Sequence, residues 1–183
     1  MRREEFEHVV RAAATIVGDE IVVVGSQAVL AQYPDAPEPL LRSLEVDLYP
    51  RSEPERSEEI DGAIGDGSPF HELFAYFAHG VGPETVTAPA GWEDRLVRLE
   101  LPPLRRKGGP VIAWCLEVHD LVLAKLAAGR EHDIEFAFEA IRGELVDADR
   151  LRIGLGLMPE SHREVTTERL EGLLSRVRRV KSP

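Results

Sequence analysis

The chain begins with hydrophobic spacings that change from helical to strand-like. A helix is predicted over residues 2–17, where one helix face collects the apolar residues Phe6, Val9, Val10, Ala13, Ile16 and Val17. Gly18 is expected to end this helix. The uninterrupted apolar run 21–24 predicts a buried strand, and a helix is predicted over 26–33. Residues 44–49 alternate apolar and polar, which predicts a second strand.

The later part of the chain is mostly helical in pattern. Further elements are predicted as a helix over 55–64, an alternating strand over 96–101, helical residues 116–141 with a break at Gly129, and helices over about 147–153 and 166–180. Residues 68–80 are apolar and aromatic and lie between Gly and Pro residues, so their pattern fits either a strand or a helix. The elements predict a mixed α/β (α+β) fold, in which a small mixed sheet is flanked by helices. We expect a core over 1–110 and a helical region over 111–183 packed on it as one compact unit.

Composition limits the classes of protein to consider. The chain has 183 residues, of which 43% are hydrophobic, so a folded core is expected. Its net charge of −11 argues against a protein that simply coats nucleic acid. The single cysteine, Cys115, excludes an internal disulfide and a cysteine metal cluster, and fits a reducing compartment. The charged N-terminus and the lack of an apolar stretch near the ~20 residues of a membrane span predict a soluble, cytoplasmic protein without membrane contact.

Candidate chemistry lies at the first two predicted strands. The first strand ends at Gly25-Ser26, where a glycine brings backbone N–H groups close to a phosphate and a serine hydroxyl adds a donor. The second strand carries Glu45 and Asp47 two residues apart, hence on one face. Two converging carboxylates suit a hard cation such as Mg²⁺. This combination is typical of phosphoryl- and nucleotidyl-transfer enzymes.

A third stretch, residues 116–133, carries Lys125, Arg130 and Asp133 in a helical pattern. With Gly25-Ser26 and Glu45-x-Asp47, the order and spacing resemble the nucleotidyltransferase superfamily, whose catalytic domain is like that of DNA polymerase beta. The chain looks most similar to small bacterial members grouped with AbiEii-type toxins of toxin–antitoxin systems. The commoner pair in the superfamily is Asp-x-Asp, and here Glu45 takes the first place.

The resemblance implies roles for the remaining candidates. Gly25 and Ser26 would hold the triphosphate of a nucleoside triphosphate, and Glu45 and Asp47 would hold Mg²⁺ or Mn²⁺. Lys125 would reach the nucleotide's phosphates, with Arg130 and Asp133 paired beside it across one helical turn. The superfamily often adds a third carboxylate on a neighbouring strand as the base, for which Glu100 is the candidate and Glu93 and Asp94 are competitors.

Two other groups of residues carry weaker signals. Basic residues gather at 105–107 and at 176–181, where they form either a solvated face or an RNA contact. The histidines at 71, 79, 119, 132 and 162 are too scattered for a sequence motif such as His-Glu-x-x-His. No zinc site is therefore expected.

The sequence predicts a Mg²⁺-dependent nucleotidyltransferase that moves a nucleoside monophosphate to an acceptor hydroxyl. The AbiEii-type resemblance implies an RNA acceptor, such as the tRNA 3′ end, and a toxin paired with a cognate antitoxin protein. Two alternatives stay open. In the first, the chain has the fold without the chemistry and serves as a binding or regulatory protein. In the second, it transfers the nucleoside monophosphate to a protein or a small molecule.

Overall fold

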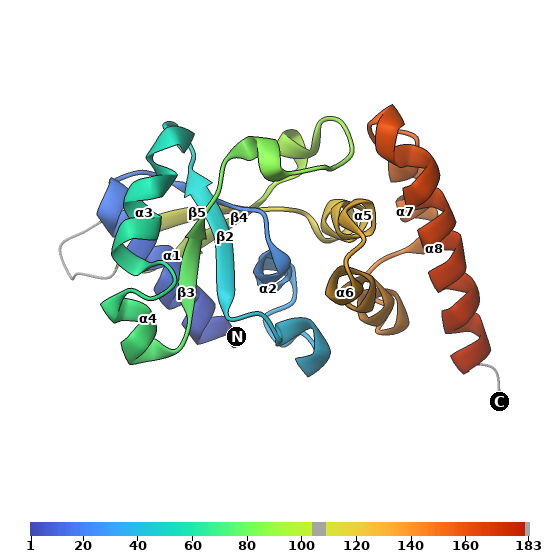
Figure 1. The fold of residues 1–183 in the computed structure, drawn as a ribbon, viewed down its shortest axis with the longest axis horizontal. Helices are drawn as coiled ribbons and strands as arrows, with labels where there is room; N and C mark the ends of the chain where they lie inside the picture. Colours follow the sequence, from blue (N-terminus) through green and yellow to red (C-terminus); the bar gives the residue numbers. More distant parts are fainter. Residues whose placement is uncertain (104–108, 182–183) are drawn as a thin grey trace. The chain divides into compact units, whose positions relative to one another are not determined.

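The computed structural model describes residues 1–103 and 109–181 of the chain (Figure 1). These residues form two compact units, a sheet unit of Met1–Thr85 with Leu96–Leu116, and a helical unit of Val86–Arg95 with Glu117–Pro183. The first unit holds the strands together with the helices of the first 85 residues, and the second holds the remaining helices.

A mixed five-stranded sheet forms the centre of the sheet unit. Its strands are β1 (Ile21–Val23), β2 (Glu45–Pro50), β3 (Phe77–Gly80), β4 (Val97–Leu101) and β5 (Val111–Cys115). They lie in the order β3-β2-β1-β5-β4. The β1–β5 and β2–β3 pairs are parallel, and the β1–β2 and β4–β5 pairs are antiparallel. All three residues of the central strand β1 are buried, which explains its uninterrupted apolar sequence. The predicted mixed α/β fold is confirmed.

Helices cover this sheet. They are α1 (Arg3–Val17), α2 (Val29–Gln32), α3 (Ser57–Ile64) and α4 (Pro69–Phe74), with short 3-10 turns η1 (Ser26–Ala28), η2 (Glu38–Leu41), η3 (Pro54–Arg56) and η4 (Pro83–Thr85). Helix α1 packs against β1, β2, β3 and β5, with α3 beside it on β3 (Figure 1). Phe6 and Val9 of α1 are fully buried. Gly18 ends α1 as predicted, in the left-handed region at φ 69°, with its N–H bonded to Ala14 O at 2.9 Å.

The helical unit consists of η5 (Trp92–Arg95), α5 (Val118–Ala128), α6 (Glu131–Arg142), α7 (Ala148–Leu155) and α8 (Glu160–Lys181). Helix α5 packs against α6, α7 and α8. Gly129 separates α5 from α6 in the left-handed conformation, at φ 69°, and this confirms the predicted break. The guanidinium of Arg95 joins the 86–95 segment to α5 through two bonds to the buried carboxylate of Asp120, at 2.8 and 3.1 Å.

Some elements differ from their predicted form. Residues 68–80 contain both a helix and a strand, because Ala75 adopts φ 61° after α4 and ends it before β3 begins. Residues 111–115 form β5, which pairs with β1 and β4, so the helical region of the chain begins after Leu116. The last helix begins at Glu160, whereas the predicted start was residue 166.

The single cysteine lies at the buried end of β5. Burial raises the pKa of Cys115 to about 12, which leaves an unreactive thiol.

None of the helices within the described residues combines the length and apolar character that crossing a bilayer requires.

Candidate functional site

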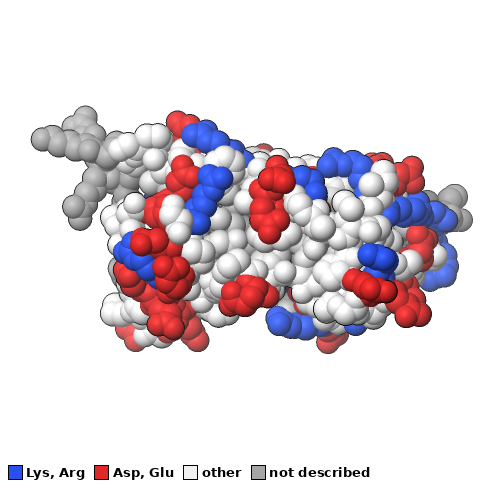
Figure 2. Space-filling model, turned by 90° about the horizontal axis from the view of Figure 1, so that it is seen from above, with Lys and Arg blue, Asp and Glu red and all other residues white. Residues whose placement is uncertain are grey.

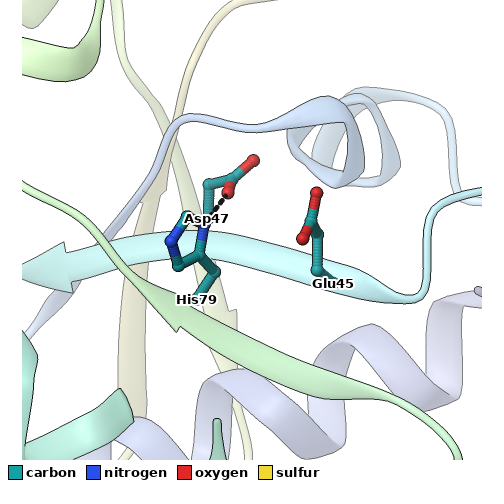
Figure 3. Close-up of side chains that lie close together, drawn as sticks. All are labelled: Glu45, Asp47 and His79. Carbon is teal, nitrogen blue, oxygen red and sulfur yellow. Dashed lines mark hydrogen bonds and ion pairs between the residues drawn. The ribbon is translucent and has the colours of Figure 1, made fainter. Parts of the chain in front are cut away.

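Glu45 and Asp47 stand together on one side of β2. The residues between and after them, Val46 and Leu48, are completely buried, whereas Glu45 is exposed and Asp47 half-buried. This alternation follows from the two-residue repeat of a strand, which turns Val46 and Leu48 into the core and both carboxylates away from it. The predicted convergence of the two acidic side chains is present in the structure (Figure 3).

His79 completes this group from the neighbouring strand. In the parallel β2–β3 pair, His79 is the register partner of Asp47, and its Nδ1 lies 2.9 Å from Asp47 Oδ1. Ligand atoms from Glu45, Asp47 and His79 all lie within 4.8 Å of one another (Figure 3). No motif along the chain singles out His79, because it joins the group only through the pairing of residues 44–49 with 77–80 as adjacent strands.

These three side chains fit a divalent cation. A cation bound by oxygen or nitrogen at about 2.0–2.2 Å holds opposite ligands about 4.2 Å apart, so ligand atoms that all lie within 4.8 Å of one another need only small side-chain adjustments. Asp47 and His79 keep 25% and 53% of their side chains exposed, which leaves room for a substrate on the same cation. With a neutral imidazole, the group carries two negative charges, which a divalent cation neutralises.

Gly25 lies directly against the carboxylate of Asp47. It follows β1, and the adjoining N–H of Val24 donates to Asp47 O at 3.0 Å. A Cβ atom at Gly25 would lie 2.0 Å from Oδ2 of Asp47, 2.7 Å from its Cγ and 2.8 Å from its Cβ. The φ of Gly25 is −80°, so space rather than backbone conformation requires glycine here. The Gly25–Asp47 contact therefore joins the two sequence motifs into one site.

The segment after Gly25 is anchored to the start of β2. Ser26 opens η1 and is partly exposed. The next residue, Gln27, is completely buried, and its Nε2 donates to Ser43 O at 3.3 Å. Its Oε1 has no hydrogen-bond partner among the described residues. Gln27, which the sequence did not single out, holds η1 next to the residues that lead into Glu45.

Lys125 and Asp133 form an ion pair in the helical unit. Lys125 Nζ lies 2.8 Å from Asp133 Oδ1, and the two side chains are 16% and 1% exposed. The expected Arg130–Asp133 pair is replaced by this contact, while the backbone O of Arg130 accepts the Asp133 N–H at 3.0 Å. Arg130 itself is exposed. The contact of Lys125 with nucleotide phosphates stays a prediction.

The candidates for a third carboxylate belong to elements other than β2 and β3. Glu100 is on β4, which β1 and β5 separate from β2 in the sheet, and it pairs with Arg98 at 2.9 Å. The sheet thus does not bring Glu100 to Glu45 and Asp47. Glu93 and Asp94 belong to η5 in the helical unit. The residue that lies beside the two carboxylates on the neighbouring strand β3 is His79.

The charged residues of the surface are mixed in sign. On the face drawn in Figure 2, acidic and basic side chains of the described residues are interspersed. The predicted basic patch at 105–107 lies outside the described residues. In the C-terminal patch, Arg176 stacks over the Phe138 ring at 4.1 Å, and Arg178 and Arg179 are exposed on α8.

Comparison with protein families gives one result that agrees with this geometry. The model of the family DUF6036, described as a nucleotidyltransferase of unknown function, matches residues 4–162, which include every residue of the site above. No curated protein and no solved structure matches the chain significantly.

Proposed function

The chain belongs to the DUF6036 family of nucleotidyltransferases, and on that premise we propose that it moves a nucleoside monophosphate from a nucleoside triphosphate to an acceptor hydroxyl. One observation carries the proposal, namely that Glu45 and Asp47 converge with the backbone of Gly25 pressed against Asp47. The same place therefore offers cation ligands and a close backbone approach for phosphate.

The residues of the site divide the work of this reaction. Glu45 and Asp47 would hold Mg²⁺ or Mn²⁺. When bound, the cation supplies positive charge to the triphosphate and to the charge that develops at the α-phosphorus. Because Gly25 has no side chain, the Asp47 carboxylate packs directly against its backbone. The Ser26 hydroxyl at the start of η1 would donate to the phosphates. The acceptor hydroxyl releases its proton to solvent and its oxygen bonds to the α-phosphorus. The bond from the α-phosphorus to the oxygen that bridges to the β-phosphorus breaks, and pyrophosphate leaves with that oxygen.

For the acceptor, the proposal is RNA, with the tRNA 3′ end as the specific site and a cognate antitoxin as the protein partner. The similarity of the motifs to AbiEii-type toxins supports this choice. The exposed arginines of α8, Arg178 and Arg179, are candidates for contact with RNA phosphates. With a net charge of −11, the chain would touch RNA locally rather than along a broad surface.

A transfer assay tests the proposal. The protein is incubated with each α-labelled nucleoside triphosphate, Mg²⁺ or Mn²⁺, and total bacterial RNA, and Asp47→Asn is run in parallel. Asp66→Asn is a matched control, because Asp66 is an exposed carboxylate that also contacts a histidine, His71, at 2.9 Å. Label on RNA with wild type and Asp66→Asn, but not with Asp47→Asn, is the expected result. Label on added protein or small molecules instead would overturn the RNA acceptor, and full transfer by Asp47→Asn would overturn the mechanism.

A further inference from the structure

The resemblance implies a third carboxylate beside the acidic pair, and the structure has an imidazole there. We infer that His79 is a ligand of the cation, and that the centre therefore binds a first-row transition cation such as Mn²⁺ in preference to Mg²⁺. The inference rests on the proposed function for the presence of a cation at Glu45 and Asp47.

Backbone packing fixes His79 in the position that a ligand needs. Parallel pairing sets it opposite Asp47, and its neighbour Ala78 is completely buried. On the other side, Gly80 fits against α3 so closely that a Cβ there would lie 2.3 Å from the Ser57 carbonyl oxygen. The strand therefore cannot slide or turn without disrupting its contact with α3. His79 is held on the same side of the sheet as both carboxylates (Figure 3).

Another histidine–aspartate pair, His71 and Asp66, differs from His79 and Asp47 in having no further ligand from the described part of the chain beside it. His71 Nδ1 lies 2.9 Å from Asp66 Oδ1, the same distance as between His79 and Asp47. Only the His79 pair, among the residues the structure describes, has a further carboxylate, Glu45, within reach of the same cation. A histidine–aspartate hydrogen bond alone would need no such partner. The three-residue convergence is the arrangement of a ligand set.

Donor chemistry then determines the preferred metal. Mg²⁺ favours an all-oxygen octahedron and keeps much of its water, whereas imidazole nitrogen is a good ligand for later divalent metals. Mn²⁺ accepts carboxylate oxygen and imidazole nitrogen in one site and still coordinates phosphate. Exchanging a third carboxylate for a neutral imidazole also lowers the negative charge that repels a triphosphate. The lower charge helps a triphosphate to bind, and the nitrogen donor favours Mn²⁺ over Mg²⁺ at this centre.

Pulsed electron paramagnetic resonance of Mn²⁺ tests the inference without nucleotide or acceptor. The ¹⁴N modulation in the echo decay reports a nitrogen bound to the manganese, and titration of the free-Mn²⁺ signal gives the affinity. Wild type is expected to show ¹⁴N modulation and to bind Mn²⁺ more tightly than Mg²⁺, which is measured by competition. His79→Gln should lose the modulation and at least ~10-fold in Mn²⁺ affinity. His71→Gln, the matched control, should keep both.

A second variant separates loss of the ligand from loss of the fold. His79→Asp restores a third carboxylate, so it should lose the modulation but bind Mg²⁺ better than wild type does. Mn²⁺ bound to wild type without ¹⁴N modulation, or modulation that persists in both His79 variants, overturns the inference. Failure of the proposed function is distinct, since ¹⁴N modulation without any transfer activity would overturn the function and leave His79 as a ligand. Transfer activity without ¹⁴N modulation would support the proposed function and overturn His79 as a ligand.

Discussion

Replacing Gly25 by alanine adds one methyl group where the structure has no space for it. The new Cβ would lie 2.0 Å from Asp47 Oδ2, 2.7 Å from Cγ and 2.8 Å from Cβ. Rotation about χ1 moves the carboxylate away but not the Asp47 Cβ, which is fixed to the backbone of β2. The main chain of β1 or β2 must therefore shift as well. Both strands are in the sheet interior, where β1 pairs with β2 and β5.

Two quantities should change by different amounts. Overpacking of a single methyl group costs about 1–3 kcal/mol, so the free energy of unfolding falls by that amount and the protein still folds. The Asp47 carboxylate loses its place beside Glu45, and a displacement of about 1 Å at a reacting centre costs on the order of 100-fold in rate. We expect Gly25→Ala to lose ~100-fold or more in transfer rate, together with most of its Mn²⁺ affinity.

Urea unfolding, Mn²⁺ titration and the transfer assay measure these effects on one preparation. Gly62→Ala is the matched control, because Gly62 lies in α3 of the same unit and a Cβ there meets no atom within 4 Å. An alanine in a helix stabilises by roughly 0.5–1 kcal/mol relative to glycine, so this variant should unfold at higher urea and keep full activity. Wild-type Mn²⁺ affinity in Gly25→Ala would refute the reasoning, since Asp47 would then be undisturbed by the added methyl.

Three further predictions concern the helical unit and the cation. Lys125→Met should destabilise by about 3–5 kcal/mol because the buried Asp133 carboxylate loses its ammonium partner, and adding Asp133→Asn should recover part of the loss in thermal unfolding. Burial raises the pKa of Glu117, but hydrogen bonds and charge from His119 outweigh it and hold the pKa at about 2, below its ordinary 4.5. The stability that Glu117 supplies is thus complete above about pH 4.5 and is lost as the pH falls toward 2, so urea unfolding of Glu117→Gln should depend less on pH in this window. Removal of divalent cations by chelation should abolish nucleotidyl transfer without unfolding the chain, and added Mn²⁺ should restore it.

Local periodicity was sufficient to place the acidic pair. The alternation of 44–49 put Glu45 and Asp47 on one face, and the left-handed glycine at 18 ended α1 where the sequence predicted. These features depend on residues only a few positions apart. The same applies to Gly129, which separates α5 from α6.

Features that depend on the pairing of distant segments could not be predicted from local periodicity. His79 joins the site only because β3 aligns with β2, and nothing in residues 68–80 fixes that register. Residues 111–115 are apolar on both sides, so their membership of the sheet follows from pairing with β1 and β4 rather than from their own pattern. Likewise, Asp133 takes Lys125 as its partner because α5 and α6 fold back on each other across Gly129.

The central claim is that Gly25, Glu45 and Asp47 form a cation-dependent nucleotide site, and nucleotide binding tests it without knowledge of the acceptor. Equilibrium binding of a non-hydrolysable nucleoside triphosphate is measured with Mn²⁺, with Mg²⁺ and with chelator, for wild type, Asp47→Asn and the Asp66→Asn control. We predict saturable binding that requires a divalent cation and is lost in Asp47→Asn alone. Absence of binding, or binding that is equally strong with chelator or in Asp47→Asn, would contradict the claim.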